Sequence, residues 1–499
     1  MMEDLYSETA KGPNAAELVE LTKSAAEVSP AEVPPDVAAE AAADTLKRLI
    51  YWESEETRPP FVLGASDIDG LSSVAEKYLP AAMKHPYLPV SEIRDQQLAR
   101  MQELVELAYR DIPVYQAKYR AAGFSPADLR EWDDIQKIPV ITKPELIAAF
   151  PERCVNPRYK PEELYPTRSS GSSGQTLLIR VDHEAILVDT VQGVRQFTLQ
   201  SGGRYRREDL LTHVYTVPWW FDSIDGWYQT AFISNLIPSA RVAQHLRELN
   251  THILSLYPSN LEALMPYADE FSSSMYLAVT HSEHSSRAAR RQWSRRLGVP
   301  VLDEYSSEEA TRIAIELPNG CYHVCDDTVH LDVLDPETMA PQTPGKSGLA
   351  VVTNLLNEAM PFIRYVQGDQ VTVPANPQPS NINWSQIASL DGRMNDAFIN
   401  REGRIIAAGS ILDATYRWMF DCDLHLAQFE MVQRDHARVE ARYVLGRGTT
   451  DAKVVGSMEH LSQLLSFCLE HPVEVKPHLL DSVSHRPGKQ RPIRREIGR

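Results

Sequence analysis

The sequence YPTRSSGSSGQTLLIRVD occupies residues 165–182 and joins a very flexible segment to an apolar run. Ser169 to Gly174 contain four serines and two glycines, and the run LLIRV follows almost at once. A Ser/Gly cluster between regular elements is usually a surface loop. A loop this compact can also direct several backbone N–H groups and hydroxyls at one anion, such as a triphosphate. Both interpretations are open from this segment alone, because it lacks the lysine of the P-loop pattern.

The chain around this loop has the pattern of an α/β protein. Between about residues 175 and 370, short strand-like apolar runs alternate with helical stretches, which indicates helices layered on sheets. The segment IRDQQLARMQELVELAYRDIPVYQAKYRAAG, residues 93–123, has the apolar spacing of a helix. We expect a variable segment at 1–45, a large N-terminal domain of mixed sheets and helices at 46–390, and a smaller α+β C-terminal domain at 391–499.

The composition indicates a globular protein and argues against a nucleic-acid partner. Its 68 acidic and 50 basic residues give a net charge of −18, which disfavours nucleic acid and anionic membranes. The five cysteines form no dense framework, which favours a reducing compartment. No stretch approaches the roughly 18 apolar residues of a membrane span, and the acidic start MMEDLYSE is unlike a signal peptide. We expect a cytoplasmic protein with no membrane partner.

Three further segments carry candidate functional residues. They are VLDEYSSEEA at 301–310, the stretch from GCYHVCDD to AMPFIRYVQGDQV that ends at Val371, and LDGRMNDAFIN at 390–400. In this order and spacing, the four segments resemble the adenylate-forming superfamily of acyl-CoA synthetases and related ligases, and most closely its phenylacetate–CoA ligase-like branch. The resemblance runs from about Gln97 to the C-terminus and includes the segment IPVITKPEL.

The resemblance implies an ATP- and Mg²⁺-dependent ligase. Such an enzyme converts a carboxylic acid to an acyl-adenylate with release of pyrophosphate, and then passes the acyl group to an acceptor, by default coenzyme A. An amine, a carrier protein or another nucleophile is also open as the acceptor, and so is a non-catalytic homologue that only binds nucleotide. The family's small domain is mobile, which places a hinge near Arg393–Asp396 with Asp396 at the hinge position. The sequence leaves the acid, the acceptor and a homodimer undecided.

The resemblance also assigns a nucleotide site. The serine-rich loop would hold the β- and γ-phosphates, Tyr305 would stack on adenine, and Ser306 replaces the family's glycine. Glu308 would bind Mg²⁺, for which a hard oxygen ligand is suitable, and Asp369 would accept hydrogen bonds from the ribose. The residues assigned to ATP are Ser169, Ser170, Gly171, Ser172, Ser173, Gly174, Tyr305, Ser306, Arg364, Asp369 and Arg393. Gln175 stands where the family has a lysine, so Arg168 or Arg180 would have to supply that charge.

Two catalytic residues and an acyl pocket complete the implied site. Glu308 is one catalytic candidate, and Lys489 in HRPGKQRPIRRE is the other, matching the C-terminal lysine that the family brings to the α-phosphate. A basic tail is the alternative for this segment. The acyl pocket aligns with an aromatic-rich stretch that would suit an aromatic acid, although dense aromatic side chains are often plain core. Its candidates are Tyr215, Trp219, Trp220, Phe221 and Trp227.

A metal site at CYHVC is a separate hypothesis. Cys321, His323 and Cys325 alternate, so a strand would place all three on one face. A structural zinc site normally needs a fourth ligand, and the family shows a GxHVxxD pattern here regardless of metal. The sequence leaves zinc binding open.

Overall fold

The computed structural model describes residues 71–169, 177–215, 224, 226–235, 237–393, 397–406, 408–446, 448–481 and 492–497. These residues form two compact units. Unit 1 contains 71–205 and 304–389, and unit 2 contains 206–303 together with the chain from Leu390 onward. The predicted segment 1–45 lies outside the described residues. The predicted large domain therefore contains a part, 206–303, that clusters with the C-terminal part, and the domain limits themselves stay a prediction.

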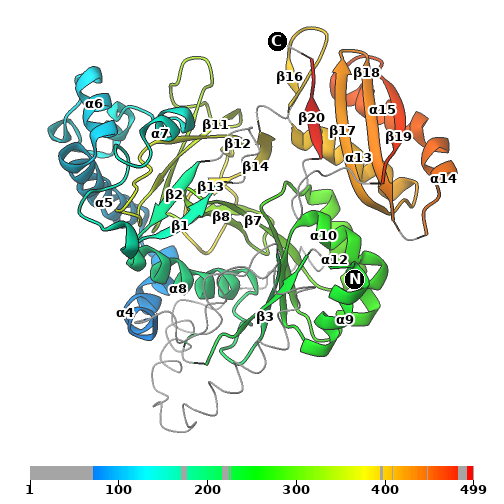
Figure 1. Cartoon of the computed structure of the whole chain (residues 1–499), viewed down its shortest axis with the longest axis horizontal. Helices are drawn as coiled ribbons and strands as arrows, with labels where there is room; N and C mark the ends of the chain where they lie inside the picture. Colours follow the sequence, from blue (N-terminus) through cyan, green and yellow to red (C-terminus); the bar gives the residue numbers. More distant parts are fainter. Residues whose placement is uncertain are drawn as a thin grey trace. The chain divides into compact units, whose positions relative to one another are not determined.

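Unit 1 combines helices with antiparallel strands, most of which are labelled in Figure 1. One of its sheets has the order β10-β11-β12, and another part has the order β13-β9-β8-β7. The strands β1 and β2 form a separate antiparallel pair. The elements are α4 (Leu71–Lys84), α5 (Val90–Asp111), α6 (Pro113–Ala122), α7 (Lys143–Ala149), β1 (Tyr165–Arg168), β2 (Leu178–Val181), α8 (His183–Gln200), β7 (Val301–Ser307, which begins in unit 2), β8 (Thr311–Glu316), β9 (Tyr322–Val324), β10 (Val329–Leu334), β11 (Ser347–Asn354), β12 (Tyr365–Thr372) and β13 (Gln386–Ile387).

The helix predicted over 93–123 is present but divided in two. Helix α5 ends at Asp111 and α6 begins at Pro113, because proline has no N–H to donate within a helix and is favoured in a first turn. Gly123 then ends α6 in the left-handed conformation, with φ of 68°. The apolar spacing was therefore a correct sign of helix, and the proline decides where the chain turns.

Helix α8 follows the serine-rich loop and β2, and it is buried from Ala185 to Gln200. Its polar side chains have partners inside the unit: the guanidinium of Arg312 on β8 lies 2.5 Å from the Asp189 carboxylate and also donates to Gln196. Gly193 lets Arg312 approach, since a Cβ there would lie 3.1 Å from its guanidinium nitrogen. Burial of these charges is tolerated because they are paired.

Unit 2 contains a parallel sheet portion with the order β6-β5-β3-β4 and a C-terminal sheet with the order β19-β18-β17-β20. Helices α13, α14 and α15 pack beside the second sheet (Figure 1). The elements are β3 (Leu211–Tyr215), β4 (Thr230–Ser234), α9 (Ser239–Leu249), β5 (Ile253–Leu256), α10 (Pro258–Leu264), α11 (Ala268–Phe271), β6 (Leu277–His281), α12 (Arg287–Leu297), β14 (Ser389–Arg393, which begins in unit 1), β15 (Phe398–Ile399), β16 (Ile405–Ile406), α13 (Ala408–Asp421), β17 (Leu426–Asp435), β18 (Arg438–Leu445), α14 (Asp451–Gly456), α15 (Met458–Leu469), β19 (Glu474–Leu479) and β20 (Ile493–Arg495).

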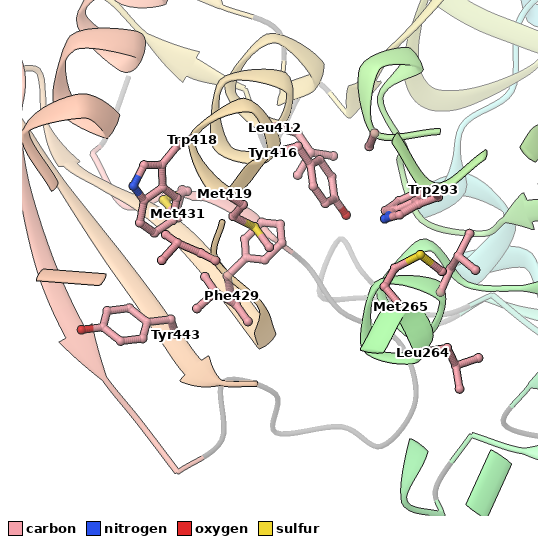
Figure 2. Close-up of a cluster of buried hydrophobic side chains, with 14 of the residues drawn as sticks. Leu264, Met265, Trp293, Leu412, Tyr416, Trp418, Met419, Phe429, Met431 and Tyr443 are labelled. Carbon is pink, nitrogen blue, oxygen red and sulfur yellow. The ribbon is translucent and has the colours of Figure 1, made fainter. Parts of the chain in front are cut away.

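One hydrophobic core runs through unit 2. It joins side chains of the 206–303 part, such as Leu264, Met265 and Trp293, to side chains of the C-terminal part, such as Tyr416 and Phe429 (Figure 2). The predicted α/β class is confirmed. Within the described part of the chain, no helix is both long enough and apolar enough to cross a membrane.

The N-cap of α8 gives a stability prediction. Asp182 accepts hydrogen bonds from the backbone N–H of Ala185, in the first turn of α8, and from that of Glu358, in the loop between β11 and β12. We expect Asp182→Ala to lower the free energy of unfolding by about 1–2 kcal/mol, because a buried cap is lost. Asp182→Asn keeps an oxygen acceptor and serves as the control in thermal denaturation. Equal melting of the alanine variant and the wild type would contradict the assignment.

Candidate nucleotide site

The strands β1 and β2 hold the two ends of the serine-rich loop together. Ser169 forms the neck of this loop with Leu177: its N–H donates to the Leu177 carbonyl, and its hydroxyl accepts from the Leu177 N–H. Ser169 is buried, at 6% exposure. The other predicted loop residues, Ser170 to Gly174, and Gln175 lie outside the described residues. Ser169 and Leu177, the described residues on either side of the loop, therefore lie next to the paired strands β1 and β2.

The predicted adenine and ribose residues meet in unit 1. The Tyr305 hydroxyl, at the end of β7, donates to the Asp369 carboxylate on β12 over 3.0 Å. A register shift between Tyr305 and Ser306, where β7 pairs with β8, changes the direction of the strand at this point. The Gln367 amide, two residues before Asp369, donates to the Ser307 hydroxyl over 2.7 Å. Tyr305 and Asp369 therefore share a hydrogen bond although they lie 64 positions apart in the sequence.

Glu308 joins this pair to the loop hairpin. Its side chain is exposed, and one carboxylate oxygen accepts from the Thr167 hydroxyl on β1 over 2.7 Å. Thr167 lies two residues before Ser169, so the same hairpin carries the loop and contacts the acid. The carboxylate is a hard oxygen ligand of the kind that Mg²⁺ binds, and Mg²⁺ in nucleotide sites typically takes only one or two protein carboxylates besides phosphates. Glu308 therefore fits the predicted metal role.

Lys143 lies at the loop neck, and the sequence assignment missed it. It begins α7, and its ammonium donates to the Ser169 hydroxyl over 2.7 Å. Thr142 and Glu145 form a capping box that fixes the start of this short helix. The pattern TKPE would have predicted a helix start at Thr142. It could not have predicted the contact with Ser169, which comes from the tertiary structure.

Arg364 has a different environment from the one predicted. It is 3% exposed, and its guanidinium donates to the backbone carbonyls of Ile135, Gln136 and Ile138. It also lies 3.1 Å from Asp332. Burial alone would raise the pKa of Asp332, but the neighbouring His330 and Arg364 charges hold that pKa below its usual range. These contacts make Arg364 a positioning residue for the chain before Lys143. They do not support direct binding of ATP by Arg364, which stays a prediction.

The backbone next to Arg364 completes this link. Ile141 pairs with β12, because its N–H donates to the Arg364 carbonyl and its carbonyl accepts from the Val366 N–H. Lys143 follows two residues later. The strand that carries Asp369 therefore also holds the segment that carries Lys143.

The predicted residues of unit 2 lie in separate environments. The ring of Tyr215 packs with those of Tyr257 and His281, at centroid distances of 4.9 Å and 5.5 Å. Trp227 lies under the Arg207 guanidinium, 4.3 Å from its ring centroid. Trp219, Trp220, Phe221, Asp396 and Lys489 lie outside the described residues, as does the side chain of Arg393.

The CYHVC segment has the contacts of a structural strand. His323 on β9 is fully buried, and burial lowers its pKa to about 4. Its ring lies near the Cys321 carbonyl and the Gln386 amide of the neighbouring strand β13. Burial raises the pKa of the Cys325 thiol to about 12. Among the residues that the structure describes, no three His, Cys, Asp or Glu side chains are grouped to hold a metal ion.

Comparison with known proteins connects this geometry to a family. No family model matches the chain. The phenylacetate-coenzyme A ligase of Escherichia coli (strain K12) is 25% identical over 333 residues, which cover 62% of this chain and 74% of the relative. The enzyme of the same name from Thermus thermophilus is 25% identical over 336 residues, covering 63% and 73%. The chain is thus similar to phenylacetate–CoA ligases over almost three quarters of their length.

Solved structures of two CoA ligases share the fold of this chain. A crystal structure of 2-hydroxyisobutyryl-CoA ligase in the postadenylation state, in complex with R3-HIB-AMP, gives a TM-score of 0.68 at 18% identity and covers 82% of this chain and 90% of that one. A structure of an anthranilate CoA ligase in complex with anthranoyl-AMP gives 0.51 at 15% identity and covers 67% of each chain. At these identities the similarity concerns the fold.

The buried guanidinium of Arg364 gives a prediction. We expect Arg364→Leu to lower the free energy of unfolding by roughly 3–5 kcal/mol, because it removes the guanidinium beside the buried Asp332 and the donor to three carbonyls. Arg364→Lys should cost less, since it keeps the charge but cannot reach three carbonyls at once. Chemical denaturation measures the loss, and hydrogen exchange at residues 135–141 locates it. The exposed Arg120, changed to Leu, is the control, and a loss no larger than that of the control would refute the role.

Proposed function

We propose that the chain is an ATP-dependent ligase that activates a carboxylic acid as an acyl-adenylate and transfers the acyl group to coenzyme A. The observation that carries this proposal is the joint placement of Tyr305, Asp369, Glu308 and the loop neck at Ser169 in unit 1. In the first step a carboxylate oxygen attacks the α-phosphorus of ATP, and the bond to pyrophosphate breaks. In the second step the thiol sulfur attacks the acyl carbon, the bond to AMP breaks, and the thiol proton is released.

The predicted site residues have distinct roles in the proposed reaction. The Asp369 carboxylate accepts hydrogen bonds from the ribose, and Tyr305, held by Asp369, offers its ring to adenine. Glu308 would hold Mg²⁺, which neutralises phosphate charge when bound. Arg393 would contact the ribose. Lys489, the C-terminal lysine, would stabilise charge between carboxylate and phosphate, and Asp396 would be the hinge that lets it approach and leave.

Lys143 supplies a cation to a loop that lacks its own. Gln175 occupies the position of the family's lysine, and the Lys143 ammonium lies at the loop neck, 2.7 Å from the Ser169 hydroxyl. In this proposal it contributes positive charge beside the β- and γ-phosphates, together with the N–H groups and hydroxyls of the loop. Arg364 acts indirectly, by fixing the segment that presents Lys143.

An aromatic acid fits the proposal best. The relatives described above are phenylacetate–coenzyme A ligases, and the candidate pocket stretch is rich in aromatic side chains, which favour a flat ring. Tyr215, already packed with Tyr257 and His281, would form one fixed wall of such a pocket. A thiol acceptor follows from the same relatives, and CoA is the first acceptor to test.

The two half-reactions give the test of this function. With phenylacetate and a panel of related aryl acids, we expect acid-dependent pyrophosphate exchange followed by thioester formation with CoA. Lys489→Ala should lose about two orders of magnitude or more in exchange, as removal of one preorganised charge-stabilising group typically does. The same variant should still form thioester from synthetic acyl-adenylate at close to the normal rate. Absence of exchange with every acid in the wild type would overturn the proposal, and equal loss in both steps would remove Lys489 from adenylation.

The role of Lys143 has its own readout. We expect Lys143→Ala to lower pyrophosphate exchange by roughly tenfold or more, because charge-assisted hydrogen bonds are worth about 1.5–3 kcal/mol. Binding of the acyl-adenylate should be unchanged, because that ligand has no β- or γ-phosphate. Lys137→Ala removes an exposed lysine of the same segment that pairs with Asp134, and serves as the control. Weakened adenylate binding in Lys143→Ala would show a general structural effect instead.

A further inference from the structure

The C-terminal part of unit 2 packs on the 206–303 part through aromatic rings. Trp293 on α12 and Tyr416 on α13 meet edge to face, with centroids 5.5 Å apart and planes at 88° (Figure 2). Tyr416 meets Phe429 on β17 in the same way, at 5.5 Å and 89°. All three rings are at most 5% exposed. Such pairs add to the free energy gained by burial of apolar area, so α13 is held against α12 by a dry contact.

A single carboxylate contacts both sides of this interface. Glu262 on α10 is 6% exposed, and its Oε2 accepts from the Trp293 indole N–H over 2.5 Å. Its Oε1 lies 3.9 Å from Nδ1 of His425, which follows α13 in the C-terminal part. The His425 side chain is 42% exposed, so water can exchange its proton. Glu262 therefore links a buried indole on one part to a titratable imidazole on the other.

The neighbouring charges leave His425 as the group that titrates. Contact with Glu262 raises the pKa of His425; Asp423 acts in the same direction, whereas Lys453 on α14 opposes it. Asp423 and Lys453 also pair with each other over 2.9 Å. Tyr416, which faces Glu262 and Glu283, has a pKa raised well above its usual value by burial and stays neutral. The second histidine of the interface region, His284 beside Gly409, has a pKa lowered to about 4 by burial, and is neutral above that pH.

We propose that Glu262, His425 and Trp293 form a proton-sensitive clasp that holds α13 of the C-terminal part against α10 and α12. Protonated His425 pairs with the Glu262 carboxylate and closes the clasp. Because the pKa of His425 is raised in the folded chain, this contribution is complete below the ordinary histidine pKa and is lost as pH rises through the raised value. The aromatic contact remains at high pH and holds the parts more weakly.

The clasp has a consequence for the reaction, which rests on the proposed function. The family's small domain moves between the two half-reactions, and such a movement here would separate Tyr416 from Trp293. A closed clasp would then retain the chain in the docked arrangement at low pH, and deprotonation of His425 would favour release. The pH would thus set the fractions of enzyme molecules in the docked and undocked states.

Hydrogen exchange on the full-length chain tests the clasp without requiring activity. The peptide to follow is α12, Arg287–Leu297, which lies in the 206–303 part and contains neither changed residue. At pH 6 we expect His425→Gln and Glu262→Gln to exchange α12 amides about two- to fivefold faster than the wild type, the effect of losing one partly screened ion pair. Glu262→Gln keeps an oxygen for the Trp293 indole, so its effect reports the charge. The double variant should exchange no faster than Glu262→Gln alone.

The matched control is His460→Gln. His460 on α15 pairs with Asp421 at the end of α13 over 2.8 Å, but within the C-terminal part, so its loss should leave α12 unchanged. At pH 8.5 the His425→Gln variant should exchange like the wild type measured at the same pH. Wild-type exchange of α12 in His425→Gln at pH 6 would overturn the clasp, and an equal acceleration at both pH values would overturn the role of the proton. Loss of ligase activity alone would not change the expected exchange rates of α12. The clasp and the proposed ligase function can therefore be refuted independently.

Discussion

The candidate site depends on one buried guanidinium. Arg364 donates to three carbonyls at the end of the short 3-10 helix Trp132–Lys137 and just after it, and Asp332 compensates its charge. Buried carbonyl groups need partners, and here a single side chain supplies them. The segment is thereby fixed along β12, which places the Lys143 ammonium at the neck of the serine-rich loop. Strand β12 also carries Asp369, so one strand organises both the ribose side and the phosphate side of the site.

The sequence predicted the parts of this site better than their connections. The alternation of apolar runs and helical spacing was sufficient to predict the α/β class, and the order of the motifs was sufficient to predict the similarity to phenylacetate–CoA ligases. Tyr305 and Asp369 share a hydrogen bond in unit 1 and Glu308 accepts one from Thr167, while the nucleotide-binding roles of these residues stay predictions. The role of Arg364 and the position of Lys143 could not be predicted, because both depend on contacts between residues far apart in the sequence. In a sequence, a charged residue beside a motif is interpreted as a ligand-binding group, whether its side chain faces solvent or the protein interior.

The grouping of the chain into units was also beyond the sequence. Nothing in the composition of residues 206–303 distinguishes them from the rest of the large predicted domain, yet they share a core with the C-terminal part. Apolar residues of α12 and α13, such as Trp293 and Tyr416, connect the two parts, because their rings pack together in the folded chain. Periodicity identifies an apolar face but not the element that covers it. A domain boundary drawn from a linker therefore separates residues that the folded chain brings together.

The shared core of unit 2 has a consequence for how the chain is made. A ribosome releases residues 206–303 long before α13, and β20, which carries the core residue Ile493, emerges later still. Until then the apolar faces around Trp293 have no permanent cover, whereas the two stretches of unit 1 are complete once residue 389 has emerged. One unit can thus mature during synthesis, while the other stays open to chaperones and to aggregation until β20 leaves the tunnel.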